Sequence, residues 1–270
     1  MKKILLLLFV SLFAVSCVDK SNDLPEDFPD SGWIQLSNNA PDEVPASIGT
    51  FNIPFSLAIG NNASGQTITY NVSLASGGPV AGLPLGDFSF NLVKGEKSGM
   101  FSIPVVNDGS SYELDVTLVS TSNLEYTIGL SDNTKKITHR IKVCKFTTNW
   151  EGTYSVSEAF YAGANQGLSL GAVFGESYQM ELVTDTSDAS GTSFLLSNSS
   201  GFNAFFDNGN HKLTLDACSE KVLFDDATPR IALWQTMTIE EAVFNGATNT
   251  ISVKGPYGPF GPYRFVLTKM

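Results

Sequence analysis

Short runs in which apolar and polar residues alternate constrain the fold of this chain more than any other feature. Side chains along a β-strand point alternately to its two faces, so a period of two predicts half-buried strands. Turn residues such as Gly77-Gly78-Pro79 and Lys94-Gly95-Glu96 separate the runs at the spacing of a β-sandwich. Between residues 33 and 144 the runs are Phe51–Leu57, Thr67–Leu74, Met100–Val105, Leu114–Leu118 and Ile137–Val143.

The remaining residues, 145–270, predict a second all-β domain. Its runs are joined by short polar turns, which favours an antiparallel up-and-down β-barrel that is closed or nearly closed. We interpret Ala159–Gly171 as a loop, because it is rich in Ala and Gly and shows no helix caps. The expected strands are Trp150–Val156, Tyr178–Val183, Ser193–Leu196, Lys212–Leu215, Lys221–Phe224, Met237–Ile239, Thr250–Val253 and Tyr263–Leu267.

The first seventeen residues predict export and a lipid anchor. Lys2 and Lys3 precede an apolar run, Ile4–Val15, that is too short to span a bilayer with ease and is typical of a signal peptide, residues 1–16. Ala14-Val15-Ser16-Cys17 resembles a bacterial lipoprotein box. The resemblance implies a diacylglycerol thioether on Cys17, with a further N-acyl chain such as palmitate, and two or more chains anchor a protein stably. An ordinary secreted protein and an uncleaved signal anchor are the alternatives.

Residues 17–32 form the lipidated cysteine and an acidic linker. Five acidic residues and two prolines against the single Lys20 make residues 18–32 a solvated, self-repelling tether, with a reach of roughly 20 Å. Acidic residues just after the cysteine also resemble the surface-export signals of Bacteroidota lipoproteins. That likeness implies an outer-membrane, lipid-anchored protein exposed at the cell surface; the periplasmic face and a plain spacer are the alternatives.

Composition narrows the classes of partner. Hydrophobic residues make up 42% of the chain and charged residues 16%, which is typical of a globular protein. Loss of Lys2 and Lys3 with the signal peptide takes the net charge from −11 to −13. Such acidity argues against nucleic acid and against adhesion to anionic lipid surfaces.

The first domain, residues 33–144, resembles a Calx-beta domain, which is an immunoglobulin-like sandwich. The likeness rests on Gly86-Asp87-Phe88, Gly95–Ser98, Phe101–Asp108 and Glu113–Leu118. It implies a calcium site with Asp87 and Asp108 as ligands and Glu43 as a weaker candidate, because calcium prefers clustered carboxylate oxygens. The sequence has Asn107-Asp108 where the family often has two aspartates, and the alternative is that Asn107-Asp108-Gly109 is simply a turn.

The second domain resembles the lipocalin-like or calycin-like domains of Bacteroidota lipoproteins in its first and last strands. Cys144 and Cys218 fall in different domains, where they could form one disulfide in an oxidising compartment or remain buried free thiols. We favour free thiols, because two-domain proteins seldom crosslink across their interface.

Catalytic groups are scarce. His139 and His211 are the only histidines and lie in different predicted domains, so no two-histidine metal site or Ser-His-Asp triad is indicated. We expect both histidines at the surface. Adjacent carboxylates occur at Glu240-Glu241 and in the acidic turn Asp225-Asp226, but neighbours on a strand point to opposite faces. The sequence therefore predicts no enzyme.

A repeat of Gly-Pro-aromatic, residues 255–263, is the remaining feature with a binding chemistry. Proline at every third residue favours a polyproline II course, which would place Tyr257, Phe260 and Tyr263 along one side. That row could stack on sugar rings, or it could fold back and close one end of the barrel; we favour the structural interpretation.

The predicted function is that of a non-enzymatic, lipid-anchored lipoprotein of the cell envelope. Its sandwich would act as a spacer and its barrel would present a surface that binds extracellular glycan or matrix. The alternative is a structural or accessory lipoprotein that contacts an outer-membrane partner protein.

Overall fold

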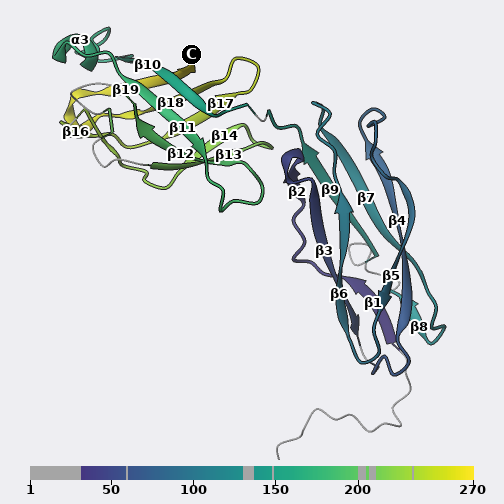
Figure 1. Cartoon of the computed structure of the whole chain (residues 1–270). Coiled ribbons are helices and arrows are strands. Elements are labelled where there is room, and N and C mark those ends of the chain that lie inside the picture. Colours follow the sequence, from purple (N-terminus) through teal and green to yellow (C-terminus); the bar gives the residue numbers. More distant parts are fainter. Residues whose placement is uncertain are drawn as a thin grey trace, which may run out of the picture.

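The computed structural model describes residues 32–58, 60–129, 137–147, 149–199, 205–206, 211–232 and 234–270. Its strands form two sandwich sheets followed by a closed barrel (Figure 1), which confirms the all-β fold class. No helix within the described residues has the length and apolar character needed to cross a membrane. The predicted signal peptide, the lipidated Cys17 and linker residues 18–31 lie outside the described residues.

A four-stranded and a five-stranded sheet make up the sandwich, with strand orders β6-β3-β1-β8 and β2-β9-β7-β4-β5. Both sheets contribute to one hydrophobic core. At its centre the ring of Phe101 stacks on Phe55 at 4.4 Å and on Tyr70 at 4.1 Å. The strands are β1 (Gly32–Leu36), β2 (Glu43–Pro45), β3 (Thr50–Ala58), β4 (Gln66–Ser76), β5 (Gly86–Leu92), β6 (Ser98–Pro104), β7 (Tyr112–Thr121), β8 (Tyr126–Ile128) and β9 (Thr138–Cys144).

The barrel is closed by antiparallel pairing of its first and last strands, β10 and β19. A separate two-stranded hairpin, β15 (Arg230–Ile231) and β16 (Gln235–Thr236), lies between β14 and β17 in sequence. The barrel strands are β10 (Gly152–Phe160), β11 (Gln179–Thr184), β12 (Ser193–Asn198), β13 (His211–Asp216), β14 (Lys221–Phe224), β17 (Glu241–Asn245), β18 (Thr250–Pro256) and β19 (Pro262–Lys269).

One of the eight predicted barrel strands, Met237–Ile239, is wrong. Met237 is buried and makes only an isolated bridge with Tyr257, and the strand begins later, at Glu241. The apolar positions change phase here, because Met237 and Ile239 are odd-numbered whereas Ala242 and Phe244, the inward-facing residues of β17, are even-numbered. The alternating pattern alone did not indicate where the ladder pairing begins.

The predicted loop Ala159–Gly171 also needs correction. Strand β10 continues to Phe160, and helix α3 (Leu170–Phe174) begins before the predicted loop ends. Contrary to the expectation of no caps, the Ser169 side chain accepts a hydrogen bond from the Ala172 N–H, and Gly175 ends the helix in a left-handed conformation.

The two cysteines form a disulfide, so the expectation of free thiols is wrong. Cys144 ends β9 and Cys218 lies in the β13–β14 turn, with their Cα atoms 5.2 Å apart. The rule that two-domain proteins seldom crosslink across their interface fails here, because the end of β9 lies beside the β13–β14 turn of the next domain.

Three further contacts lie at the junction of sandwich and barrel. Phe146 is buried in the barrel core, where its ring meets Phe244 edge to face at 6.4 Å. The Asn107 side chain donates to the Phe146 carbonyl at 2.7 Å, and the Ser47 hydroxyl donates to the Ser190 carbonyl at 2.6 Å. The disulfide is thus accompanied by direct polar and apolar contacts.

Both histidines are buried rather than at the surface. On β9, His139 occupies the same face as Ile141 and Val143, and its Nε2 lies 3.0 Å from the Pro41 carbonyl. On β13, His211 faces inward and its ring lies 4.8 Å from that of Phe206. The period of two that predicted these strands places each histidine on the buried face.

Candidate functional site

The strongest candidate site is a cluster of three aromatic side chains at the surface of the barrel, which we name the aromatic platform: Phe174, Trp234 and Phe260. The Trp234 ring lies 4.4 Å from that of Phe260 with an interplanar angle of 35°. Phe174 meets Trp234 nearly at right angles, with ring centroids 5.8 Å apart. Trp234 is 45% exposed and Phe174 40% exposed, so solvent reaches the rings while they contact one another.

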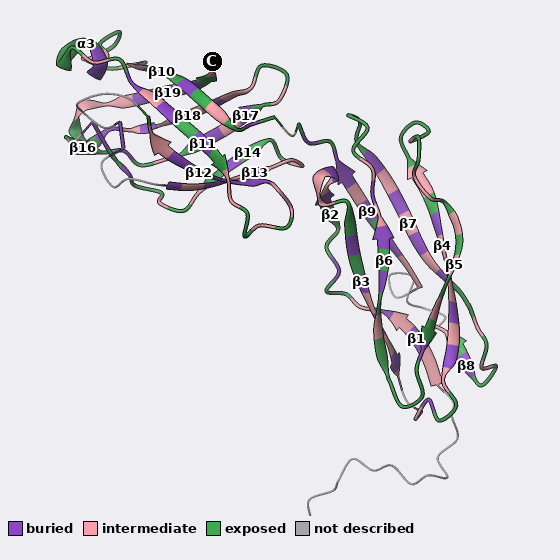
Figure 2. Cartoon of the chain, viewed as in Figure 1, coloured by how far each residue is buried: buried purple, intermediate pink, exposed green. Residues whose placement is uncertain are grey.

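Each ring of the platform comes from a different element. Phe174 ends α3, Trp234 lies in the turn of the β15–β16 hairpin, and Phe260 lies in the 3-10 helix η2 (Gly258–Phe260) between β18 and β19. Figure 2 shows exposed residues along α3, at the end of the barrel remote from the sandwich. The platform therefore depends on how the barrel brings distant segments together.

The Gly-Pro-aromatic repeat does not form the predicted polyproline II row. Tyr257 has φ −103° and ψ 86°, and Gly258 and Gly261 have positive φ, so the chain turns instead of extending. Tyr257 and Tyr263 are fully buried in the barrel core, and only Phe260 is partly exposed. Of the three predicted binding residues, the structure therefore places Phe260 alone at the surface.

The buried Tyr257 supports the platform from beneath. Its hydroxyl donates to the Ile231 carbonyl at 2.9 Å and accepts from the Gln235 N–H at 3.2 Å, which fixes the β15–β16 hairpin. Its ring also lies 6.1 Å from Trp234 and 6.2 Å from Phe260. The first aromatic residue of the repeat is thus structural, as the favoured interpretation of the repeat expected.

Other exposed apolar side chains lie on the chain segments that lead to Phe174. Tyr161, Leu168 and Val173 lie on the loop after β10 and on α3, and are 40%, 53% and 60% exposed. The Asn165 side chain donates to the Phe260 carbonyl at 2.7 Å and so ties this loop to η2. An exposed apolar patch of this kind usually marks an interaction site.

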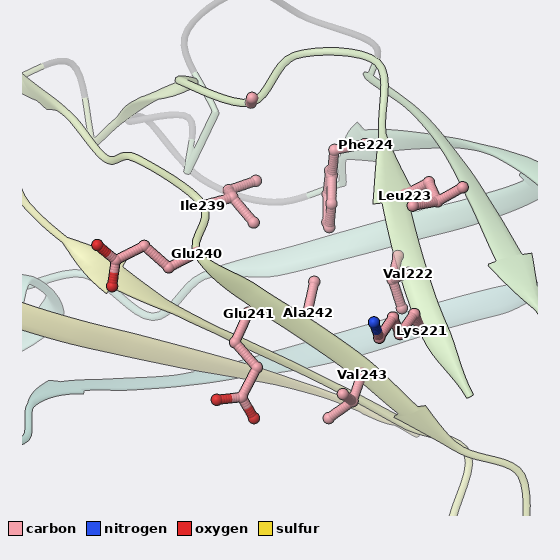
Figure 3. Close-up of a pocket in the computed structure, with 10 residues that line it drawn as sticks. Lys221, Val222, Leu223, Phe224, Ile239, Glu240, Glu241, Ala242 and Val243 are labelled. Carbon is pink, nitrogen blue, oxygen red and sulfur yellow. The ribbon is translucent and has the colours of Figure 1, made fainter. Parts of the chain in front are cut away.

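A groove of about 530 Å³ opens between β14 and β17, where the two strands diverge. They share a single register pair, Lys221 with Val243. Figure 3 shows Phe224, Ile239 and Ala242 around a common space, while the carboxylate of Glu240 extends away from it. Lys221, Glu240 and Glu241 line the groove together with these apolar side chains.

The adjacent acidic pairs form no joint site in the described structure. Glu241 pairs with Lys254 across β17 and β18, with 3.3 Å between Nζ and Oε1. Asp226 accepts a hydrogen bond from the Thr228 N–H at 2.8 Å, as expected of an acidic turn.

The predicted calcium ligands each have a protein partner. Asp87 accepts from the Asn71 side chain at 2.7 Å, and Glu43 lies 3.2 Å from the Lys142 ammonium. Asp108 accepts from both the N–H and the hydroxyl of Ser110, and these bonds lower the pKa of its carboxyl. Asn107-Asp108-Gly109 is therefore a turn.

Asp87 and Asp108 also lie far apart. Asp87 lies opposite Asn71 on β4, and Asn71 in turn lies opposite Thr117 on β7. Thr117 is five residues, or about 17 Å, from the first residue of β7, whereas Asp108 comes before that first residue. Within the described residues, no three His, Cys, Asp or Glu side chains gather where a metal ion could bind. Calcium binding stays a prediction of the sequence resemblance.

Sequence reasoning identified Phe260 and missed Trp234 and Phe174. Trp234 follows a two-residue strand, and Phe174 belongs to a helix of five residues. Neither segment is long enough to give a periodic signal. The Ser169 cap and Gly175 were the available signals for α3, but no local pattern indicated that its last residue would contact the hairpin.

Comparison with known proteins finds similarity among solved structures. No protein-family model and no curated protein matches the chain. Among solved structures, it is similar to the apo-form Calx CBD1 domain, with 13% identity over 42% of this chain and 96% of that chain, at a TM-score of 0.33. It is also similar to CBD12 from CALX1.2, with 10% identity over 84% of this chain and 82% of that chain, at a TM-score of 0.34. At such TM-scores, neither similarity carries an argument about ligand or function.

Proposed function

We propose that this chain is a non-enzymatic, lipid-anchored protein of the cell envelope that binds an extracellular glycan on its aromatic platform. The observation that carries the proposal is the exposed contact between Trp234, Phe260 and Phe174. The C–H face of a sugar ring is apolar and flat, and covering it with an aromatic ring removes apolar area from water.

The place of the platform favours a ligand outside the cell over the protein's own membrane. In Figure 1, β1 begins at the end of the sandwich remote from the barrel, and α3 lies at the barrel end remote from the sandwich. A chain tethered through Cys17 ahead of β1 would therefore hold the platform away from its anchor. The acidic net charge of −13 after signal removal also opposes binding to anionic lipid.

Two observations support the envelope location. The first seventeen residues carry the signal and lipoprotein-box pattern. Independently, Cys144 and Cys218 are disulfide-bonded, and structural disulfides persist in oxidising compartments outside the cytosol.

The anchor is tested by replacing its sulfur. We expect Cys17→Ala to abolish incorporation of labelled palmitate and to release the protein from the membrane fraction, because the acyl chains supply the binding energy. Labelling that survives the substitution would refute lipidation at Cys17. Cys218→Ala is the control: it removes a cysteine other than Cys17, so this variant should still incorporate labelled palmitate.

The glycan proposal is tested by Trp234→Ala. A sugar face that covers roughly 60 Å² of the indole would contribute about 1.5 kcal/mol, which corresponds to about tenfold in affinity. We expect the variant to lose about that factor in retention on a polysaccharide array, with an unchanged melting temperature.

Leu195→Ala is the matched control, because it removes an exposed apolar side chain, 38% accessible, from β12 of the same barrel. It should leave retention unchanged. Equal retention of the wild type and Trp234→Ala on every glycan would contradict the proposal. The exposed Leu168 and Val173 would then favour the second candidate, an accessory lipoprotein that docks an outer-membrane partner protein.

A further inference from the structure

We infer that Glu158 is the positioning residue of the aromatic platform: its carboxylate ties helix α3, and with it Phe174, to the wall of the barrel. The role in ligand binding rests on the proposed function, whereas the mechanical role does not. Glu158 lies on β10 and is not itself one of the three platform residues.

Three donors converge on this carboxylate. Glu158 Oε2 accepts from the Leu170 N–H at 2.9 Å, and Oε1 accepts from the Gly171 N–H at 2.8 Å. The hydroxyl of Tyr263, on the neighbouring strand β19, donates to Oε2 at 2.9 Å. One side chain of the barrel wall therefore holds both the start of α3 and the last aromatic residue of the Gly-Pro-aromatic repeat.

The contact compensates for the small size of α3. The first N–H groups of any helix lack partners within it, and a helix of five residues has little stability of its own. Here Glu158 takes the N–H groups of Leu170 and Gly171, and Ser169 takes that of Ala172 at 3.1 Å. The start of α3 is thereby fixed to β10.

Residue 171 must be glycine for this arrangement. A Cβ atom there would lie 3.3 Å from Glu158 Oε1 and 2.7 Å from the Glu176 carbonyl oxygen. Because the second of these neighbours is backbone, it cannot rotate away. The absence of a side chain at Gly171 thus allows the Glu158 carboxylate to approach the start of α3.

Tyr263 is suited to its part in the contact. Burial raises the pKa of the Tyr263 hydroxyl, and the negative charge of Glu158 raises it further. The hydroxyl therefore keeps its proton and remains a donor at neutral pH. With Tyr257 beneath the hairpin and Phe260 within the platform, each aromatic residue of the repeat serves one part of the same structure.

The consequence lies at the other end of α3. Phe174 is the last residue of the helix, and its ring meets Trp234 at 5.8 Å. If the start of α3 detaches from the barrel, this contact is lost, while the ring contacts of Trp234 with Phe260 and Tyr257 remain. Glu158 thus acts on the platform through α3.

The test compares Glu158→Gln with Glu151→Gln in the full chain. Glutamine is close to glutamate in size, but its amide group presents N–H donors where α3 also presents donors. Glu151 is the matched control, because its carboxylate accepts the Thr184 N–H at 2.9 Å on the same barrel, away from α3. We expect amide hydrogen exchange in residues 172–174 to become about tenfold faster in Glu158→Gln and to stay unchanged in Glu151→Gln.

A second measurement reports on the platform directly. With 5-fluorotryptophan incorporated, the ¹⁹F resonance of Trp234, assigned by its absence in Trp234→Phe, should shift in Phe174→Ala. Glu158→Gln and Gly171→Ala should shift it in the same direction, since both would separate Phe174 from Trp234. Tyr263→Phe, which removes one of the three donors, provides a milder variant if Glu158→Gln does not fold.

The outcomes separate the inference from the proposed function. Unchanged exchange in α3, or an unshifted Trp234 resonance, would overturn the role of Glu158. Where the wild type retains a glycan, Glu158→Gln should weaken that retention as much as Phe174→Ala does. If Glu158→Gln loses the contact between Phe174 and Trp234 but still retains the glycan fully, the positioning role is overturned as well. If no glycan is retained at all, the proposed function fails, while the exchange and ¹⁹F results still decide the mechanical role.

Discussion

Gly255→Ala is expected to destabilise the barrel by about 3 kcal/mol, the upper end of the usual cost of overpacking. A Cβ atom at this position of β18 would overlap the carbonyl oxygen of Thr238 and lie 2.9 Å from its carbonyl carbon and 3.2 Å from the Glu240 nitrogen. All three atoms belong to the backbone, so no side-chain rotation relieves the clash. The Thr238 N–H also donates to the Pro256 carbonyl at 3.0 Å, and this bond would be disturbed.

Thermal unfolding of the two glycine variants Gly255→Ala and Gly78→Ala measures this effect. We expect a drop of about 10 °C for Gly255→Ala, as follows from about 3 kcal/mol in a domain of this size. Gly78 has open space around its Cβ position and no positive φ, so Gly78→Ala should change the melting temperature little. Equal melting temperatures for both variants would show that β18 can move away from residues 238–240.

Loss of the disulfide between Cys144 and Cys218 is expected to have a comparable or larger effect. The crosslink spans 74 positions of sequence, and in the chain-entropy model a loop of that length contributes about 4 kcal/mol at 25 °C. The closed loop contains β10 to β13, so the barrel should lose more stability than the sandwich. Contacts such as that of Ser47 with Ser190 would remain, but without a covalent link beside them.

The measurement is unfolding of the wild type and of Cys144→Ala with Cys218→Ala, each with and without reductant. Reduction should lower the free energy of unfolding of the wild type. The double variant should be as stable as the reduced wild type, and reductant should not change its stability. A double variant as stable as the oxidised wild type would contradict the prediction. The double variant is needed because each single substitution leaves one free cysteine, which could form a disulfide with another thiol.

Period-two alternation predicted most strands because burial on one face of a sheet imposes it directly. The same rule, applied strictly, would also have placed His139 and His211 inside, since each shares its face with buried aliphatic residues. The polar neighbours of His139 and the turn beside His211 favoured a surface position, but neither feature decides which face of the strand a side chain occupies. The lesson is that within an established strand the register decides burial more reliably than the type of residue does.

The platform was only partly predictable. The Gly-Pro-aromatic repeat drew attention to Phe260, but proline spacing predicted an extended course, and the glycines at 258 and 261 adopt positive φ and turn the chain. Burial of Tyr257 and Tyr263 then follows from the turn. Trp234 and Phe174 reach Phe260 from segments too short to carry a pattern of their own.

By itself the sequence determined the all-β class and most of the strands, because these follow from local periodicity. Export and lipidation at Cys17 stay predictions from the short motif Met1–Cys17. Tertiary structure alone decided that Cys144 meets Cys218 and that Glu158 holds α3. It also decided that three rings from separate elements form one exposed surface. The physical reason is that barrel closure, and the meeting of the sandwich with the barrel, bring together residues from separate elements, and no local pattern encodes such proximity.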